Sequence, residues 1–161
     1  MFAHAWLQQV LDYDPADGCF RWKVSRKNQY ARAGSVAGYI DSGGYRIIEI
    51  KGKAYKAHRL VWFYMTGQWP KYNIDHINGE KHDNRFCNLR DATHSINMQN
   101  RRKPLPFNST GFLGVRKNCR GFLASITVYG KRRNLGTYKT PEEAHAVYLK
   151  AKRKLHPGNT L

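Results

Sequence analysis

One stretch, NIDHINGEKHDNRFCNLRDATHSIN at residues 73–97, most restricts what this chain can fold into. Its first five residues mix apolar and polar side chains in the manner of a short, partly buried strand. Asn78-Gly79 follows and is a strong turn signal. A second strand is expected at 88–92, and Thr93 can serve as the N-cap of a following helix. The stretch therefore predicts the order strand, loop, strand, helix.

The chain before this stretch predicts a β-rich extension. Residues 18–24 and 44–50 are typical of strands, because they are rich in aromatic and β-branched side chains. Helices are expected at 5–11 and 56–67, and Gly67 suits the left-handed C-terminal cap of the second one.

The last third of the chain predicts a small sheet packed on one helix. Strands are expected at 111–118, 121–130 and 132–138. The middle strand alternates apolar residues, which would face a core, with polar ones. A helix over 140–158 is indicated by Thr140 as N-cap and by Glu143, which completes a capping box.

These patterns predict an α+β chain with two modules. The first module is expected at 1–103, with its motif core at 56–101, and the second at 111–161. Residues 104–110 are expected to form a linker, because NRRKPLPFNSTG (100–111) holds two prolines and a Ser-Thr-Gly run.

Positive charge dominates the composition. The 161 residues include 28 Lys and Arg against 11 Asp and Glu, a formal net charge of +17. Residues 101–161 hold 14 basic and only 2 acidic side chains, so the shorter part carries most of the excess. A polyanionic partner is therefore expected, with nucleic acid as the first candidate and an anionic membrane as the second.

No apolar run approaches the roughly 20 residues of a membrane-spanning helix. The N-terminus lacks the basic start and long apolar stretch of a signal peptide, so a cytoplasmic, non-secreted protein is expected. The three cysteines, Cys19, Cys87 and Cys119, are far apart, and no C-x-x-C occurs. Neither a disulfide framework nor a four-cysteine zinc site is supported.

The 73–97 stretch also carries the residue types that phosphodiester cleavage needs. Such a reaction requires a base that activates water and a cation that neutralises the phosphate and the departing 3′ oxygen. Asp75-His76 places an oxygen ligand beside a candidate base, although strand neighbours point to opposite faces unless the strand ends or twists there. Asn88 and Asn97 follow and offer amide groups, whose oxygens suit Mg²⁺.

The pieces AHRLVW, IDHINGE, DNR and NLR between Ala57 and Asn97 resemble the HNH endonucleases, close to the phage and intron-encoded homing group. This resemblance implies a ββα-metal fold in which His76 is the general base. Asn88 would hold the His76 imidazole through its amide oxygen, and Asp75 with Asn97 would hold one divalent metal, Mg²⁺ or Mn²⁺. Candidate phosphate contacts in this module are Arg59, Arg85 and Arg90.

Two plainer interpretations compete at this stretch. Asn-Gly and Asp-Asn pairs also form ordinary turns, so a polar loop without chemistry would explain several of its residues. A zinc site could draw on His76, His82, Cys87 and His94, which have suitable donor atoms. Their order and spacing match no standard zinc finger, so no structural zinc is expected.

Residues 110–158 resemble the ethylene-response-factor type of DNA-binding domain (the AP-two fold), through GFLGVRKN, FLASI, RRNLGTY and TPEEAHAVYLKA. The resemblance implies a sheet that lies in the major groove of double-stranded DNA. The groove-facing residues would be Arg116, Asn118, Arg120, Ser125, Thr127, Arg132, Asn134 and Thr137. Phosphate contacts are expected from Lys117, Lys131 and Arg133. Polar or basic residues replace two tryptophans of the plant domains, so their sequence preference is not carried over.

Two functions are weighed. The first is a site-specific, metal-dependent DNA endonuclease of the homing type, which would nick one strand if it is monomeric, the favoured state. The second is a non-catalytic DNA-binding regulator that keeps the nuclease scaffold. His76 and both metal-ligand positions are present, which favours the enzyme. No small-molecule cofactor and no membrane partner are expected.

Overall fold

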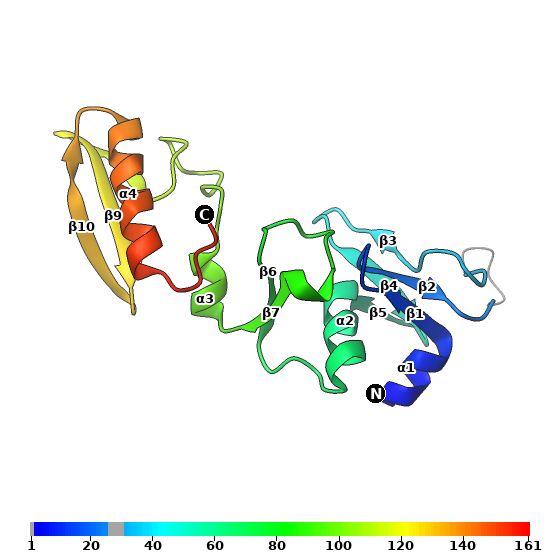
Figure 1. Cartoon of the computed structure of the whole chain (residues 1–161). Helices are drawn as coiled ribbons and strands as arrows, with labels where there is room; N and C mark the ends of the chain where they lie inside the picture. The colour runs from blue at the N-terminus through cyan, green and yellow to red at the C-terminus, as the bar shows by residue number, and fades with distance from the viewer. Residues whose placement is uncertain (1, 26–30) are drawn as a thin grey trace. The chain divides into compact units, whose positions relative to one another are not determined.

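A computed structural model describes residues 2–25 and 31–161 as a chain of small antiparallel sheets and four α-helices (Figure 1). The chain divides into two compact units, Met1–Thr93 and His94–Leu161. The α+β class expected from the sequence is confirmed. Within the described residues, no helix is both long and apolar enough to cross a membrane.

The N-terminal unit begins with α1 (His4–Val10) and a hairpin of β1 (Leu11–Asp14) and β2 (Cys19–Trp22). A three-stranded sheet follows, in the order β3 (Tyr39–Ile40), β4 (Arg46–Ile50) and β5 (Lys53–Lys56). Helix α2 (Ala57–Thr66) ends at Gly67, whose positive φ of 72° forms the expected left-handed cap. One core, including Leu7, Phe20, Ile48 and Leu60, joins these elements.

The predicted strand, loop, strand, helix order is confirmed. Strand β6 (Asn73–His76) pairs antiparallel with β7 (Leu89–Ala92), and a short 3-10 turn η1 (Phe86–Asn88) precedes β7. Helix α3 (His94–Gln99) comes next (Figure 1). It belongs to the C-terminal unit.

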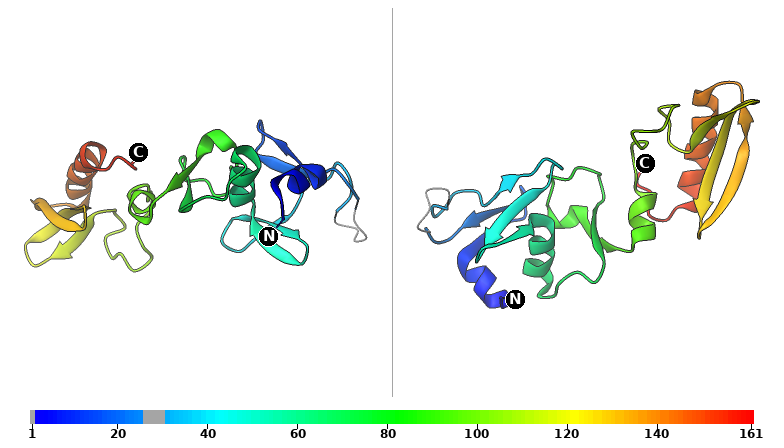
Figure 2. Two further views of the ribbon diagram at one scale, coloured as in Figure 1. Left: turned by 90° about the horizontal axis from the view of Figure 1, so that it is seen from below. Right: turned by 180° about the vertical axis from the view of Figure 1, so that it is seen from behind.

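The C-terminal unit has the predicted sheet and helix. Strands β8 (Val115–Asn118), β9 (Gly121–Val128) and β10 (Lys131–Tyr138) form an antiparallel sheet with β9 in the centre. Helix α4 (Pro141–Leu155) lies along one face of this sheet (Figure 2). Both hydrogen bonds of the Thr140–Glu143 capping box are present.

Contacts with the C-terminal tail place α3 and the segment after it in the C-terminal unit. Gln99 Oε1 accepts a hydrogen bond from the Gly158 N–H at 3.0 Å, and Arg102 donates to Thr160 Oγ1 at 2.6 Å. The Lys152 ammonium donates to the Arg101 carbonyl at 2.7 Å. The division at Thr93 and His94 therefore comes earlier than the linker expected at 104–110.

Candidate active site

Asp75 and His76 are the last two residues of β6, and both are buried. In the register of the hairpin, Asp75 lies opposite Arg90 and His76 lies opposite Leu89. The strand ends at His76, and the Gly79 N–H donates to the His76 carbonyl at 2.9 Å to close the Asn-Gly turn. The candidate base therefore stands at a strand end, as the sequence argument required.

Asn84 contacts the His76 imidazole through its side-chain amide. Its Oδ1 lies 3.1 Å from His76 Nε2, and its Nδ2 donates to the His82 carbonyl at 3.3 Å. An amide oxygen only accepts, so Nε2 must carry the proton of this hydrogen bond. In that tautomer Nδ1 is the basic nitrogen of the ring.

Burial keeps the His76 imidazole neutral. It lowers the pKa of His76, against the opposing effect of the hydrogen bond to Asn84. The neighbouring His58 is also buried, and burial lowers its pKa to about 3. A neutral imidazole at neutral pH is the form that can accept a proton from water.

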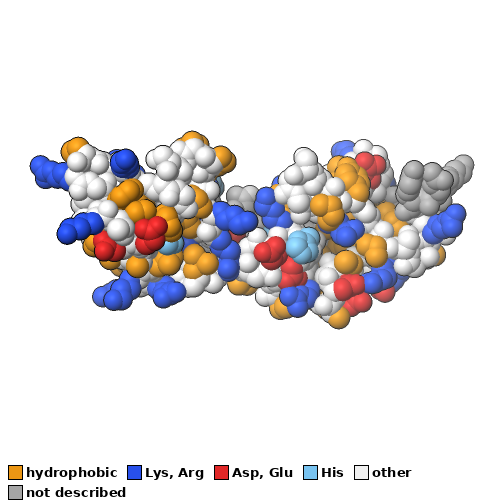
Figure 3. Space-filling view, turned by 90° about the horizontal axis from the view of Figure 1, so that it is seen from above, with side chains coloured by type: hydrophobic (Ala, Val, Ile, Leu, Met, Phe, Trp, Pro, Cys, Tyr) orange, Lys and Arg blue, Asp and Glu red, His pale blue; other side chains and the backbone are white. Residues whose placement is uncertain are grey.

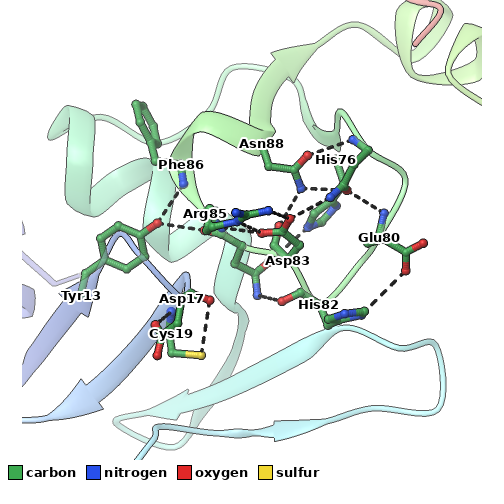
Figure 4. A network of polar contacts seen from close by, with 12 residues as sticks. Tyr13, Asp17, Cys19, His76, Glu80, His82, Asp83, Arg85, Phe86 and Asn88 are labelled. Atoms are coloured by element: carbon green, nitrogen blue, oxygen red, sulfur yellow. Dashed lines mark hydrogen bonds and ion pairs between the residues drawn. The ribbon is translucent and has the colours of Figure 1, made fainter. Parts of the chain in front are cut away.

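The Asn88 side chain braces the loop that carries Asn84. Its Oδ1 accepts from the Asn78 N–H at 2.9 Å. Its Nδ2 donates to Asn78 Oδ1 at 2.9 Å and to the Asp83 carbonyl at 2.8 Å. This differs from the expectation that the Asn88 amide oxygen accepts from His76, because that oxygen satisfies the backbone of the Asn-Gly turn instead (Figure 4).

Asp83 and Arg85 stabilise the same loop. Arg85 binds the Asp83 carboxylate through two nitrogens, at 2.8 and 2.6 Å, and Asn78 Nδ2 donates to it at 2.7 Å. The hydrogen bonds from Arg85 lower the pKa of Asp83 to about 2. The carboxylate is therefore charged over the whole range in which the protein would work.

The first hairpin supports the loop from the other side. The Tyr13 hydroxyl donates to the Asn84 carbonyl at 3.0 Å and accepts from the Phe86 N–H at 2.8 Å (Figure 4). Gly18 has a positive φ of 72° and lies against the backbone of the loop. A Cβ atom at this position would lie 2.4 Å from the backbone nitrogen of Arg85. The N-terminal extension thus fixes the position of Asn84 and, through it, of His76.

The Asp75 carboxylate is paired with Arg90. Asp75 Oδ2 lies 2.8 Å from Arg90 Nε and 2.7 Å from a terminal nitrogen of the same guanidinium. Among residues 2–25 and 31–161 there is no group of three or more His, Cys, Asp and Glu side chains that could hold a metal. Asp75 offers a carboxylate oxygen at the end of β6, and Asn97, on α3 of the C-terminal unit, offers an amide oxygen; both are oxygen types that suit Mg²⁺.

The three arginines expected to contact phosphate are each engaged within the protein. Arg90 binds Asp75, Arg85 binds Asp83, and Arg59 donates to the Tyr72 carbonyl at 3.3 Å. His82 and His94 are exposed.

The sheet of the C-terminal unit has one polar face. Residues paired across its strands share a face, and Ser125 pairs with Asn134 while Thr127 pairs with Arg132. Arg116 and Thr137 lie opposite the same residue of β9, Leu123. This face is opposite to Ala124, Ile126 and Val128, which are buried.

Two of these polar residues contact each other: Arg132 Nε donates to Ser125 Oγ at 3.2 Å, and Ser125 is buried. Asn118 instead accepts from the Arg120 N–H and stabilises the turn before β9. The side chains of Lys117, Lys131 and Arg133 are exposed. Lys and Arg side chains are spread over the molecular face drawn in Figure 3, and acidic ones are sparse on its C-terminal unit.

Comparisons with known proteins agree with this geometry. The family model described as HNH endonuclease matches residues 55–99, which run from the end of β5 to the end of α3. Protein 3.8 of Escherichia phage T7 is 32% identical over 107 residues, which cover 65% of this chain and 87% of that protein. The chain therefore contains an HNH endonuclease domain over residues 55–99. No solved structure matches it.

The HNH domain contains two features that the sequence argument did not assign. Asn84 was expected to be a turn residue, although the Asp-Asn-Arg piece that contains it is part of the HNH resemblance. His58 had no assigned role, and its ring centroid lies 5.0 Å from that of His76. Tyr45, from the segment that leads into β4, contacts both rings, and nothing in the local sequence around it indicated this.

Proposed function

We propose that this HNH-domain protein is a metal-dependent DNA endonuclease of the homing type. The observation that carries the proposal is the buried imidazole of His76, held by Asn84 beside the Asp75 carboxylate. Burial would keep the ring neutral, and the hydrogen bond to Asn84 Oδ1 would place its proton on Nε2, as a general base requires.

In this proposal His76 takes a proton from the attacking water at Nδ1. Asn84 orients the ring, and Asn88 acts through the loop by holding Asn78 and the Asp83 backbone in place. The metal, Mg²⁺ or Mn²⁺, would be held by Asp75 and Asn97 and would supply charge for the phosphate and the departing 3′ oxygen. The products would carry 5′-phosphate and 3′-hydroxyl ends, as in the homing group.

The C-terminal sheet is proposed to select the DNA site, in the manner of the ethylene-response-factor domains. Its polar face is wide enough to present several side chains to the major groove. The proposed modules are residues 1–103 for cleavage and 111–161 for recognition, joined by 104–110. The excess of basic residues after residue 100 supports this division, because phosphate contacts dominate affinity for DNA.

A monomer with one such site would nick one strand, and we propose that this is its activity in the cytoplasm of the host cell. The test is nicking of supercoiled plasmid that carries the insertion site of the gene, with Mg²⁺ present. Wild type should nick, and His76→Ala should lose roughly 10²- to 10⁴-fold in rate while still binding the DNA. His82→Ala, an exposed histidine of the same loop, is the matched control and should nick at the wild-type rate.

Equal nicking by wild type and His76→Ala would contradict the proposal. So would the absence of nicking by wild type on a plasmid that it demonstrably binds, which would favour the non-catalytic regulator. For the recognition module, Arg116→Ala and Arg132→Ala should weaken binding to the target. Arg153→Ala, an exposed residue of α4, is the control for the loss of one positive charge.

A further inference from the structure

Three rings meet beside the candidate base. The Tyr45 ring centroid lies 5.4 Å from that of His58 and 6.2 Å from that of His76. The two imidazoles lie 5.0 Å apart with their planes nearly perpendicular, at 86°. Tyr45 immediately precedes β4 and lies outside the β6–β7 hairpin, so the segment that leads into the N-terminal sheet forms one wall of the site.

Two lysines surround the Tyr45 ring. The Lys56 ammonium lies 4.3 Å from the ring centroid and the Lys81 ammonium 4.9 Å from it. Lys56 lies opposite Ile47 in the β4–β5 pair, two residues along from Tyr45, which brings it within reach of the ring. Lys81 comes from the loop after β6 and also donates to the Gly43 carbonyl at 2.9 Å.

These two ammonium groups carry like charge, and across residues 2–25 and 31–161 neither is ion-paired with a carboxylate. Both side chains are exposed. Cation–π contacts orient them but leave their charge uncompensated. Besides burial, the positive charges of Lys56 and Arg59 also lower the pKa of His58.

We propose that Lys56 and Lys81 form a binding site for a backbone phosphate of the DNA, adjacent to the phosphate that is cut. Phosphate oxygens would compensate the charge of these ammonium groups, and Lys binds phosphate well as a point charge. Tyr45 is the positioning residue, because its ring contacts both lysine ammonium groups and also the His76 ring. The proposal rests on the proposed nuclease function and adds a DNA contact from the N-terminal sheet.

The experiment uses the full-length chain and a short labelled DNA duplex. The double variant Lys56→Gln/Lys81→Gln is compared with wild type by binding at several salt concentrations and by nicking. Losing one phosphate contact should reduce the slope of log affinity against log salt by about 0.9. Nicking should fall by roughly 10²-fold, because the contact with the adjacent phosphate would no longer position the reacting phosphate at His76.

A matched control is available in Lys51→Gln. Lys51 lies 4.2 Å from the Trp6 ring centroid, so it makes the same type of cation–π contact, but with an aromatic residue that is not part of the ring cluster at His76. It should keep the wild-type slope and rate. Tyr45→Phe keeps the ring and should behave as wild type, whereas Tyr45→Leu should resemble the lysine double variant. Thermal unfolding of each variant shows whether it is folded.

The outcomes separate this proposal from the nuclease function. If wild type nicks and the double variant keeps both the slope and the rate, the phosphate site is overturned and the nuclease function stands. If wild type binds DNA without nicking it, the nuclease function fails, and the salt slope alone decides the phosphate site. A slope that falls equally in Lys51→Gln would also overturn the site, because the effect would then be a general loss of charge.

Discussion

Arg90 and Asp75 face each other across the β6–β7 pair, with Arg90 Nε 2.8 Å from the Asp75 carboxylate. The carboxylate side chain is 6% exposed and the guanidinium 26%. The pair therefore joins the proposed metal ligand to the strand that follows the active-site loop. An arginine expected to bind DNA phosphate instead compensates the most buried acidic side chain of the HNH domain.

Arg90→Ala should destabilise the N-terminal unit by about 2 kcal/mol, because it leaves a buried carboxylate without its cation. The double variant Arg90→Ala/Asp75→Ala should lose less than the sum of the single losses. Urea unfolding of the four proteins measures the coupling energy. Additive losses would show that the pair contributes no coupling.

Asn84→Asp should change the pH dependence of nicking. A carboxylate at this position, beside His76 Nε2, raises the pKa of the imidazole, so more of the base is protonated at neutral pH. The nicking rate should fall at pH 7 and recover as the pH rises, and the acidic limb of the profile should move to higher pH. Asn84→Ala should lower the rate without this recovery. An unchanged pH profile in Asn84→Asp would show that residue 84 does not influence the protonation of His76.

Asp83 should contribute stability that depends on pH in the acidic range. Its pKa is lowered to about 2 in the folded chain by Arg85, against an ordinary value of 3.8. The unfolded state therefore binds the proton first, and the contribution is fully present above about pH 4 and is lost as the pH falls toward 2. The difference in Tm between wild type and Asp83→Asn should be constant near neutral pH and shrink below pH 4.

Lys152 should make the stability of the C-terminal unit depend on pH in the alkaline range. It is 1% exposed, and burial lowers its pKa to about 8 from an ordinary value of 10.5. The folded state releases its proton first, so stability should rise as the pH increases from about 8 to 10.5. Lys152→Met should remove this rise relative to wild type. A parallel pH dependence in the two proteins would mean that Lys152 titrates normally.

Much of the fold can be predicted from residues that are close together in the sequence. The Asn78-Gly79 turn, the Gly67 cap and the Thr140–Glu143 capping box each depend on residues close together in the chain, and the structure contains all three. The alternation in the middle strand of the C-terminal sheet likewise identified its buried face, because strand periodicity does not depend on the rest of the chain. The burial of Lys152, in contrast, is not encoded in the sequence of α4, because it depends on packing against the chain after α3.

The sequence by itself determined the HNH domain, its strand, loop, strand, helix order and the position of a carboxylate, Asp75, next to His76 in the chain. The tertiary structure decided which groups contact them. Asn84 rather than Asn88 lies beside His76 Nε2, and Arg90 lies on Asp75. Tyr45 and Lys56 join the site from a different part of the N-terminal unit. The reason is physical: residue type and spacing identify the atoms that chemistry needs, but hydrogen-bond partners depend on which loops and strands pack together.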